Sequence, residues 1–448
     1  MTSVVLQNSP AAENASSSSP VPDSGIPAGQ TLALPIPEIP TQEAIDGIRF
    51  DFNDGLRVWL PKGAKSYRVR FVDLDNKFTV FDITTQSGPA TADQPTWIVS
   101  MRKYYIRFRL IISTPDEDKL LFAHDYDAKG KDVVVRAVSG AIGDTIAWFS
   151  YVPRFQRKHQ CKMHCVVSKW FIPLVQAQYP EIDFITEEQA KERAEELKAY
   201  ATYTVVLWNE GNDTNQVVDH RYVGLHKTGA YILGVDDAEE PPQFDLSAPR
   251  QIPEKYVCIA VQASALAKMW NHPTGWREVV AFLQQQGYRV LCIDKERFTG
   301  IPGSFTYMPE GAEDFTGDRP LQERINLIKD ADFFIGLSSG LSWVAWGCKV
   351  PVVMISGFTH PTNEFATPYR VINYHTCHSC WNDMRENFDH FDFLWCPRHT
   401  GDDRQFECTR LISPEQVIAT IKKIPSFKPA EKKEDGKSSS KKNAPEKQ

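Results

Sequence analysis

The chain has 448 residues and a formal net charge of −7 at pH 7, with 50 lysines and arginines against 57 aspartates and glutamates. This length allows two or three domains, and the acidic balance argues against a general nucleic-acid-binding protein. Nine cysteines in so long a chain exclude a secreted disulfide scaffold.

Both ends of the chain are expected to be disordered. Residues 1–44 are rich in Ser, Pro and Ala, and residues 428–448 form a tail of Lys, Glu and Ser, so neither has much to bury. No basic start is followed by an apolar stretch, so we expect no secretory signal. No apolar run approaches the length needed to cross a bilayer. These features predict a cytoplasmic protein that binds no nucleic acid and does not insert into a membrane.

Residues 45–132 predict a small antiparallel β-domain. Short strand-like segments such as 56–60 and 67–71 are separated by turn sequences. Two Asp-x-Asp pairs, the signature of magnesium–nucleotide sites, lie in this region at 73–75 and 125–127. Because these pairs lie outside the α/β part of the chain, we interpret them as turn residues. No divalent ion is therefore expected to be required for a nucleotide.

From Val133 onward the sequence repeats strand, glycine turn and helix. The alternation runs through residues 133–250 and restarts at Tyr256, within residues 251–427. Two successive halves of this kind predict an α/β fold with two Rossmann-like lobes that face each other across a cleft. The helices are expected over residues 145–156, 187–200, 276–286, 320–329 and 341–347.

The first strand-to-helix turn of the first lobe, residues 140–144, reads Gly-Ala-Ile-Gly-Asp. It is not Gly-x-Gly-x-x-Gly, which disfavours a dinucleotide-binding dehydrogenase. Glycines such as Gly143 let a bulky ligand approach the backbone. Asp144 is expected at the mouth of the cleft, where a carboxylate can take a proton from an acceptor hydroxyl as general base. An ordinary helix N-cap is the alternative, because aspartate is favoured there.

In the second lobe, the turn at 336–340 reads Gly-Leu-Ser-Ser-Gly and contains Ser338, Ser339 and Gly340. Small residues at a helix start expose backbone N–H groups and the positive end of the helix dipole, which suits a diphosphate. Lys268, in the turn after the first strand of this lobe, is expected to point into the cleft and neutralise a leaving diphosphate. Plain helix capping and a solvated lysine are the alternatives.

Four cysteines within residues 375–411 predict a metal-stapled loop. A Cys-x2-Cys pair is followed by a third cysteine after fifteen residues and a fourth after eleven more. Four sulfurs complete a tetrahedron and leave no open position, so the ion would be structural. Spacing does not choose between zinc and iron, and free thiols in an irregular segment are the alternative. The four residues are Cys377, Cys380, Cys396 and Cys408.

Taken together, these motifs resemble the bacterial autotransporter heptosyltransferases, which are related to the ADP-heptose:lipopolysaccharide heptosyltransferases. The N-terminal β segment Phe50-Asp51-Phe52-Asn53-Asp54-Gly55 and the four-cysteine loop narrow the resemblance, which covers roughly residues 45–425. The donor-binding half of the family is matched by Asp314-Phe315-Thr316-Gly317, Pro320-Leu321, Asp332, the 336–340 turn, Pro351-Val352-Val353 and Gly357-Phe358-Thr359.

The resemblance implies a GT-B-type pair of Rossmann-like lobes preceded by the small β-domain. It implies an inverting transfer of heptose from ADP-glycero-manno-heptose to serines of an autotransporter adhesin passenger domain, in the cytoplasm. Asp144 would be the general base, and the donor would be bound by Lys268, Ser338, Ser339, Gly340 and Gly143. The resemblance also implies iron in the cysteine site and a homo-oligomer, a dodecameric ring. The N-terminal extension and the Lys-rich tail are not part of the family pattern.

Two other functions fit these residues. One is a lipopolysaccharide-core heptosyltransferase with a sugar acceptor, and the other is a non-catalytic metal-stapled scaffold that binds a nucleotide or an adhesin. The β-domain and the cysteine loop favour a protein acceptor, because neither is needed to present a small saccharide. Asp144 and Lys268 argue against the scaffold, which needs neither residue.

Overall fold

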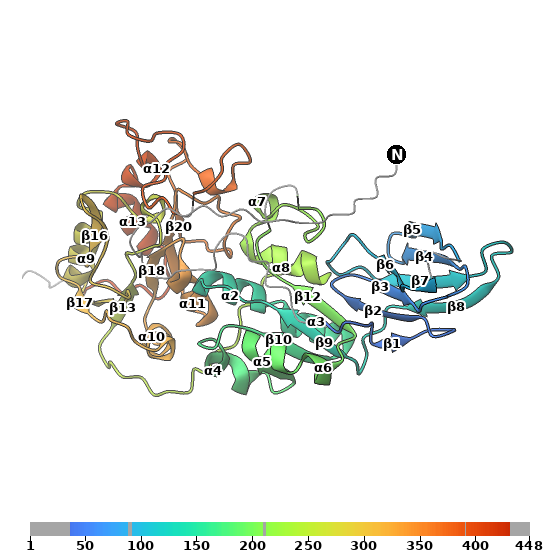
Figure 1. The fold of residues 1–448 in the computed structure, drawn as a ribbon. Coiled ribbons are helices and arrows are strands. Elements are labelled where there is room, and N and C mark those ends of the chain that lie inside the picture. Colours follow the sequence, from blue (N-terminus) through green and yellow to red (C-terminus); the bar gives the residue numbers. More distant parts are fainter. Residues whose placement is uncertain (1–35, 88–91, 209–211, 390, 431–448) are drawn as a thin grey trace, which may run out of the picture.

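The computed structural model describes residues 36–87, 92–208, 212–389 and 391–430. Figure 1 shows two α/β lobes in a row, with an antiparallel β region beyond the first lobe and away from the second. The expected disordered ends lie largely outside the described residues. The described part of the N-terminal segment includes the short strand β1 (Gln42–Glu43), which pairs with β2 (Arg49–Asn53).

The sheet of the second lobe has the order β17-β14-β13-β18-β19-β20, and all its neighbouring strands are parallel. If the separate hairpin is left out, this is the order 3-2-1-4-5-6 of a doubly wound fold, whose ligands bind where the order reverses. The reversal lies between β13 and β18. The strands are β13 (Tyr256–Ile259), β14 (Arg289–Cys292), β17 (Glu313–Asp314), β18 (Phe334–Leu337), β19 (Val352–Ile355) and β20 (Arg370–Val371), and the hairpin is β15 (Phe298–Ile301) with β16 (Ser304–Tyr307).

The sheet of the first lobe repeats the first part of this order. Its four parallel strands run β11-β10-β9-β12, so the reversal lies between β9 and β12. The turn that contains Asp144 follows β9 directly, just as the segment with Lys268 follows β13. The strands are β9 (Asp132–Arg136), β10 (Lys162–Val166), β11 (Ile182–Ile185) and β12 (Ala201–Thr204).

The β-rich segment expected at 45–132 does not form a single separate sheet. Strand β2 pairs in parallel with β12, so β2, β3 and β6 extend the sheet of the first lobe, whereas β5-β4-β7-β8 forms an antiparallel sheet of its own. Burial explains the division: four of the five residues of β2 are buried, whereas the residues of β5 are exposed or half-buried. The strands are β3 (Arg57–Leu60), β4 (Arg68–Asp73), β5 (Phe78–Thr84), β6 (Thr96–Val99), β7 (Phe108–Ser113) and β8 (Leu120–Asp125).

Two of the expected helices are interrupted. The helix expected over 145–156 is two helices, α2 and α3, because the ring of Pro153 clashes with the carbonyl of Phe149 in a continuous helix. The helix expected over 187–200 breaks at Arg193 and ends before Lys198, which has a left-handed backbone (φ 43°). The first-lobe helices are α2 (Ile142–Phe149), α3 (Val152–His159), α4 (Ile172–Val175), η1 (Gln176–Gln178), α5 (Glu187–Glu192), α6 (Ala194–Leu197), α7 (His220–Val223) and α8 (Leu225–Leu233).

The second lobe has its helices close to the expected positions. One core cluster contains residues of both lobes, among them Trp148 of α2 and Trp343 of α11, so the lobes share a packed interior. In the part of the chain that the structure describes, no helix is both long and apolar enough to span a membrane. The helices are η2 (Leu266–Lys268), α9 (Gly275–Gln285), α10 (Leu321–Ile328), α11 (Gly340–Gly347), η3 (Cys380–Asn382), α12 (Glu407–Arg410) and α13 (Pro414–Ile421).

Candidate functional site

The N-terminal ends of α2 and α11, one from each lobe, pack directly against each other (Figure 1). A methyl group placed on Gly143 would lie 2.8 Å from the ring of Trp343, and one placed on Gly340 would lie 2.9 Å from Cβ of Ile142. Both distances are too short for a real side chain, so the glycines allow the two helices to meet. The meeting brings two positive helix ends to one place, where they favour an anion.

Asp144 lies in the first turn of α2 and is not its N-cap. The N-cap is Ala141, which has no side chain that could cap the helix, so the alternative role proposed for Asp144 is wrong. One carboxylate oxygen of Asp144 accepts a hydrogen bond from Ser139 Oγ at 3.0 Å, and the side chain is partly exposed. Burial raises the pKa of Asp144, and the nearby charge of Lys268 and the Ser139 hydroxyl lower it.

Lys268 lies at the end of η2 and is half-buried. Its Nζ is 3.5 Å from Ser264 Oγ and lies over two aromatic rings, 5.9 Å from the centre of Phe358 and 5.8 Å from that of Trp381. Burial lowers the pKa of Lys268, whereas the charges of Asp144 and Glu364 raise it. The charges of Asp144 in the first lobe and Lys268 in the second therefore act on each other, and the lysine is more than a solvated surface charge.

The turn at 338–340 has two different serines. Ser338 is buried; its hydroxyl donates a hydrogen bond to Glu364 and accepts one from Thr359 Oγ1 at 3.0 Å. Ser339 is the N-cap residue of α11, but its partly exposed side chain makes no capping hydrogen bond. The groups of this turn that are placed to meet a phosphate are therefore the Ser339 hydroxyl and the first backbone N–H groups of α11.

Glu364 is a buried carboxylate of the same site that the sequence analysis missed. Only 2% of it is exposed, and its oxygens accept hydrogen bonds from Ser338, from Asn363 Nδ2 at 2.9 Å and from Arg370 Nη1 at 3.0 Å. A buried charge of this kind requires a partner. The sequence does contain a signal for it: Glu364 and Arg370 are the only charged residues between Lys349 and Asp383.

The four cysteines of the predicted metal loop lie in one part of the second lobe, near enough for their charges to act on one another. Cys380, Cys396 and Cys408 are buried, and the thiol of Cys408 lies in the electrostatic field of the other three. Burial raises the pKa of Cys377 to about 12 and that of Cys380 to about 11, so a bound cation is needed to keep these sulfurs as thiolates. Such a set of soft donors fits a metal ion.

Two other possible ligands lie beside the first cysteine. One ligand atom each of Cys377, His399 and Glu407 lies within 4.8 Å of the others. The backbone N–H of Cys377 donates to Glu407 Oε1 at 3.0 Å, and Arg404 pairs with the same carboxylate. Because Arg404 already holds Glu407, this carboxylate serves better as a support of the loop than as a replacement for a thiolate.

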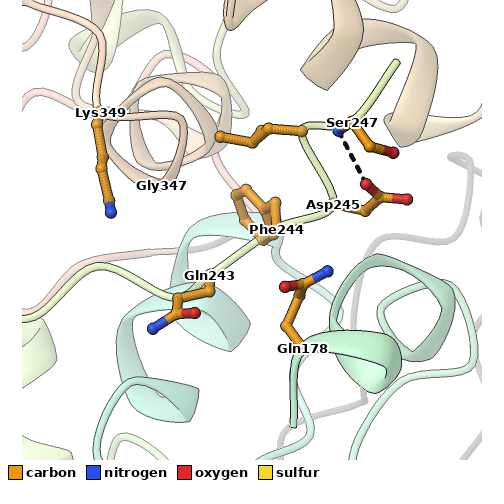
Figure 2. A pocket seen from close by; sticks show the side chains of 8 residues that line it. Gln178, Gln243, Phe244, Asp245, Ser247, Gly347 and Lys349 are labelled. Carbon is orange, nitrogen blue, oxygen red and sulfur yellow. Dashed lines mark hydrogen bonds between the residues drawn. The ribbon is translucent and has the colours of Figure 1, made fainter.

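A pocket of about 320 Å³ lies at the opposite end of α11 (Figure 2). Figure 2 shows Phe244 of the interlobe connection beside Gly347, and Asp245 accepting a hydrogen bond from the backbone of Ser247. None of the residues predicted for the site lines this pocket, so the candidate site is at the N-terminal end of α11. The pocket is lined by Gln178, Gln243, Phe244, Asp245, Leu246, Ser247, Gly347 and Lys349.

Comparisons with known proteins match most of the chain. The family "Glycosyltransferase TibC, N-terminal domain" matches residues 45–116, and "Glycosyltransferase family 9 (heptosyltransferase)" matches residues 194–386. The autotransporter heptosyltransferase Aah of Escherichia coli is 47% identical to this chain over 391 residues, which cover 87% of the chain and 96% of Aah. The chain belongs to the autotransporter heptosyltransferases. This confirms the resemblance found in the sequence and makes the chain a member of a glycosyltransferase family.

A solved structure of this family has the same fold. The heptosyltransferase TibC of enterotoxigenic Escherichia coli, in a crystal complex with ADP-D-beta-D-heptose, is 47% identical to this chain and superposes with a TM-score of 0.80. The match covers 87% of this chain and 98% of TibC. TibC is an iron-containing, dodecameric glycosyltransferase. The predicted fold of two α/β lobes with an N-terminal β region is thereby confirmed.

The family also contains a protein that is not catalytic. BimC of Burkholderia thailandensis, an inactive autotransporter heptosyltransferase, is 39% identical over 396 residues, which cover 88% of this chain and 89% of BimC. Overall similarity therefore does not decide whether a member of this family is active. That decision depends on the residues of the site.

Proposed function

We propose that this protein transfers heptose from ADP-glycero-manno-heptose to serine hydroxyls of an autotransporter adhesin passenger domain. The observation that carries the proposal is the place of Asp144, at the start of α2 where this helix meets α11, within reach of the charge of Lys268. A base beside a phosphate-binding cation is the combination that glycosyl transfer from a nucleoside diphosphate sugar requires. Family membership supports the choice of donor and acceptor.

In the proposed reaction, the serine oxygen attacks the anomeric carbon and its proton passes to Asp144. The bond between the anomeric carbon and the β-phosphate oxygen breaks, and ADP leaves with the electron pair, so the configuration is inverted. Lys268, the Ser339 hydroxyl and the N–H groups at the start of α11, including that of Gly340, stabilise the charge on the departing diphosphate. Gly143 acts by letting α2 approach α11.

The cysteine loop is proposed to hold one structural metal ion on Cys377, Cys380, Cys396 and Cys408. Iron is the preferred ion because TibC contains it, and zinc is the chemical alternative. Replacing Cys377 or Cys408 by serine should release the metal and lower the melting temperature, measured by elemental analysis and calorimetry. A metal-free variant that stays folded and active would contradict the structural role.

The setting of the reaction is part of this proposal. The protein would act in the cytoplasm on passenger domains before their export, as a homo-oligomer that the dodecameric TibC suggests is a ring. Light scattering of the purified protein measures the number of subunits. A monomer at working concentration would contradict the ring.

The deciding experiment is intact-mass analysis of an adhesin passenger co-expressed with this protein or with its Asp144→Asn variant. Mass additions of one heptose each, absent with the variant, are expected. ADP release from ADP-heptose with a lipopolysaccharide-core saccharide, but not with the passenger, would favour the sugar-acceptor enzyme. Binding of the passenger or nucleotide without any transfer would favour the non-catalytic scaffold. BimC shows that an inactive member of this family exists.

A further inference from the structure

One side chain of the cysteine loop, Trp381, lies directly on the lysine of the candidate donor site. Trp381 lies in η3, directly after Cys380, and its ring is 5.8 Å from Lys268 Nζ. The ring of Phe358 lies on the same ammonium at 5.9 Å, and the two rings are 5.9 Å apart. A partly desolvated ammonium that lies over two neighbouring aromatic rings is stabilised by cation–π interaction, which favours one position of the ammonium.

The indole N–H of Trp381 is also linked to Lys268, through a chain of hydrogen bonds that ends at Glu364. Its Nε1–H donates to Asn363 Oδ1 at 3.0 Å, and Asn382 Nδ2 donates to the same oxygen at 3.2 Å. The amide group of Asn363 then donates to Glu364 at 2.9 Å. Glu364 is one of the two carboxylates whose charge acts on Lys268.

The segment that carries Trp381 depends on hydrogen bonds to other segments, because a 3₁₀ helix of three residues is not stable by itself. Ser379 N–H donates to Gly357 O at 2.7 Å, and Trp381 N–H donates to Phe358 O at 3.1 Å. Asn382 Oδ1 accepts from the backbone N–H of His360 at 2.9 Å. These bonds join η3 to the strand-following segment 357–360, and Cys380 joins it to the predicted metal site.

The same helix also contacts the first lobe. Asn382 Nδ2 lies 3.4 Å from the backbone oxygen of Arg221 in α7, and the rings of His220 and Trp381 are 5.8 Å apart. In addition, Leu225 N–H of α8 donates to Asn363 O at 3.0 Å. Asn363 is therefore the point at which the cysteine loop, the second lobe and the first lobe are hydrogen-bonded together.

We propose that Trp381 is a positioning residue for the donor-binding lysine, and that the cysteine loop thereby sets the geometry of the donor site. Trp381 acts in two ways: its ring orients the ammonium of Lys268, and its N–H orients Asn363 and, through it, Glu364. This inference rests on the proposed function, in which Lys268 binds the diphosphate of the donor. It gives the metal-stapled loop a role in substrate binding besides its role in folding.

The test compares Trp381→Leu, Trp381→Phe and the matched control Phe391→Leu, whose ring is on the same loop and is 87% exposed. The metal content of each purified protein is measured by elemental analysis, and the dissociation constant for ADP by titration calorimetry. Trp381→Leu should bind ADP roughly 5- to 30-fold more weakly than the control, the range expected for a desolvated cation–π contact. Trp381→Phe keeps an aromatic face but no N–H donor, so the loss should be smaller, about 2- to 10-fold.

Kinetics and a double-mutant cycle separate positioning from general damage. The KM for ADP-heptose should rise in Trp381→Phe while kcat at saturating donor changes less than about threefold. Combined with Lys268→Ala, Trp381→Leu should cost much less ADP affinity than it does alone, because the lysine through which it acts is gone. The inference is overturned if both Trp381 variants bind ADP like Phe391→Leu, or if the loss is the same size without Lys268.

The outcomes also distinguish this inference from the proposed function. If Lys268→Ala itself leaves ADP affinity unchanged, the proposed donor site is wrong and the inference falls with it. If Lys268→Ala weakens binding but the Trp381 variants do not, only the inference is wrong. If Trp381→Leu fails to retain metal, the comparison of Trp381→Phe with Phe391→Leu decides, since phenylalanine preserves the ring packing.

Discussion

In the first lobe, the loop at the sheet reversal presents one carboxylate, Asp144, with one hydrogen bond from Ser139. In the second lobe, the matching segment after β13 presents Lys268, and Glu364, between β19 and β20, binds Ser338, Asn363 and Arg370 in a buried network. Both lobes use the same strand order at the reversal. The same fold can therefore hold a carboxylate with a single hydrogen bond in one lobe and a carboxylate in a buried hydrogen-bonded network in the other.

The largest effect is expected from a change of Asp144 in the first lobe. Asp144→Asn keeps the shape of the side chain but removes the base, so kcat should fall by about 10²- to 10⁴-fold, while ADP affinity stays near the wild-type value. Steady-state kinetics and calorimetry measure the two quantities. Asp116→Asn, an exposed aspartate in the turn before β8, is the matched control. Near-normal turnover with Asp144→Asn would remove the functional difference between the lobes.

The next largest effect is expected from a change in the buried Glu364–Arg370 pair of the second lobe. Glu364→Gln leaves the guanidinium of Arg370 buried without its carboxylate, and breaking such a pair costs on the order of 3–5 kcal/mol in the free energy of unfolding. Denaturant unfolding measures this loss. The double variant Glu364→Leu/Arg370→Leu should recover much of it, because it removes both charges. If Glu364→Gln is as stable as the wild type, the network does not hold the second lobe as the comparison requires.

The pH dependence of activity tests the link between the two sides. Burial raises the pKa of Asp144, so its carboxylate is protonated, and activity is lost, at a higher pH than an ordinary aspartate would give. The charge of Lys268 lowers this pKa, so Lys268→Met should move the acid limb of kcat/KM to higher pH. It should also weaken ADP binding roughly tenfold to a hundredfold, the range for a charge-assisted hydrogen bond. An acid limb that does not move would mean that the two residues do not interact.

The smallest expected effect tests the contact between the helices. Gly143→Ala and Gly340→Ala each place a methyl group where the partner helix lies, and such overpacking costs about 1–3 kcal/mol. Thermal unfolding and ADP affinity should both decline. Gly229→Ala in α8 is the control, because the nearest atom to its added methyl group would be 3.3 Å away. Equal effects at all three glycines would show that the α2–α11 contact is not special.

Much of the fold could be predicted from the sequence, since short-range patterns determine it. Apolar strands, glycine turns and amphipathic helices in the regions 133–250 and 251–427 predicted the two lobes, and the chain order placed Asp144, Lys268 and Ser338 after strands. The prediction of one helix over 145–156 did not take account of Pro153, which divides it into α2 and α3. The β-rich segment was recognised as strands, but its division between two sheets was not.

What the sequence by itself determined was the set of strands and helices and the cysteine spacing, because these depend on residues near one another in the chain. Only the tertiary structure decided that the charges of Asp144 and Glu364 act on Lys268, that Glu364 binds Ser338, and that Trp381 of the cysteine loop lies on the same ammonium. The reason is physical. Each of these contacts joins segments far apart in the chain, so it depends on how sheets and helices pack, and local periodicity carries no information about that packing.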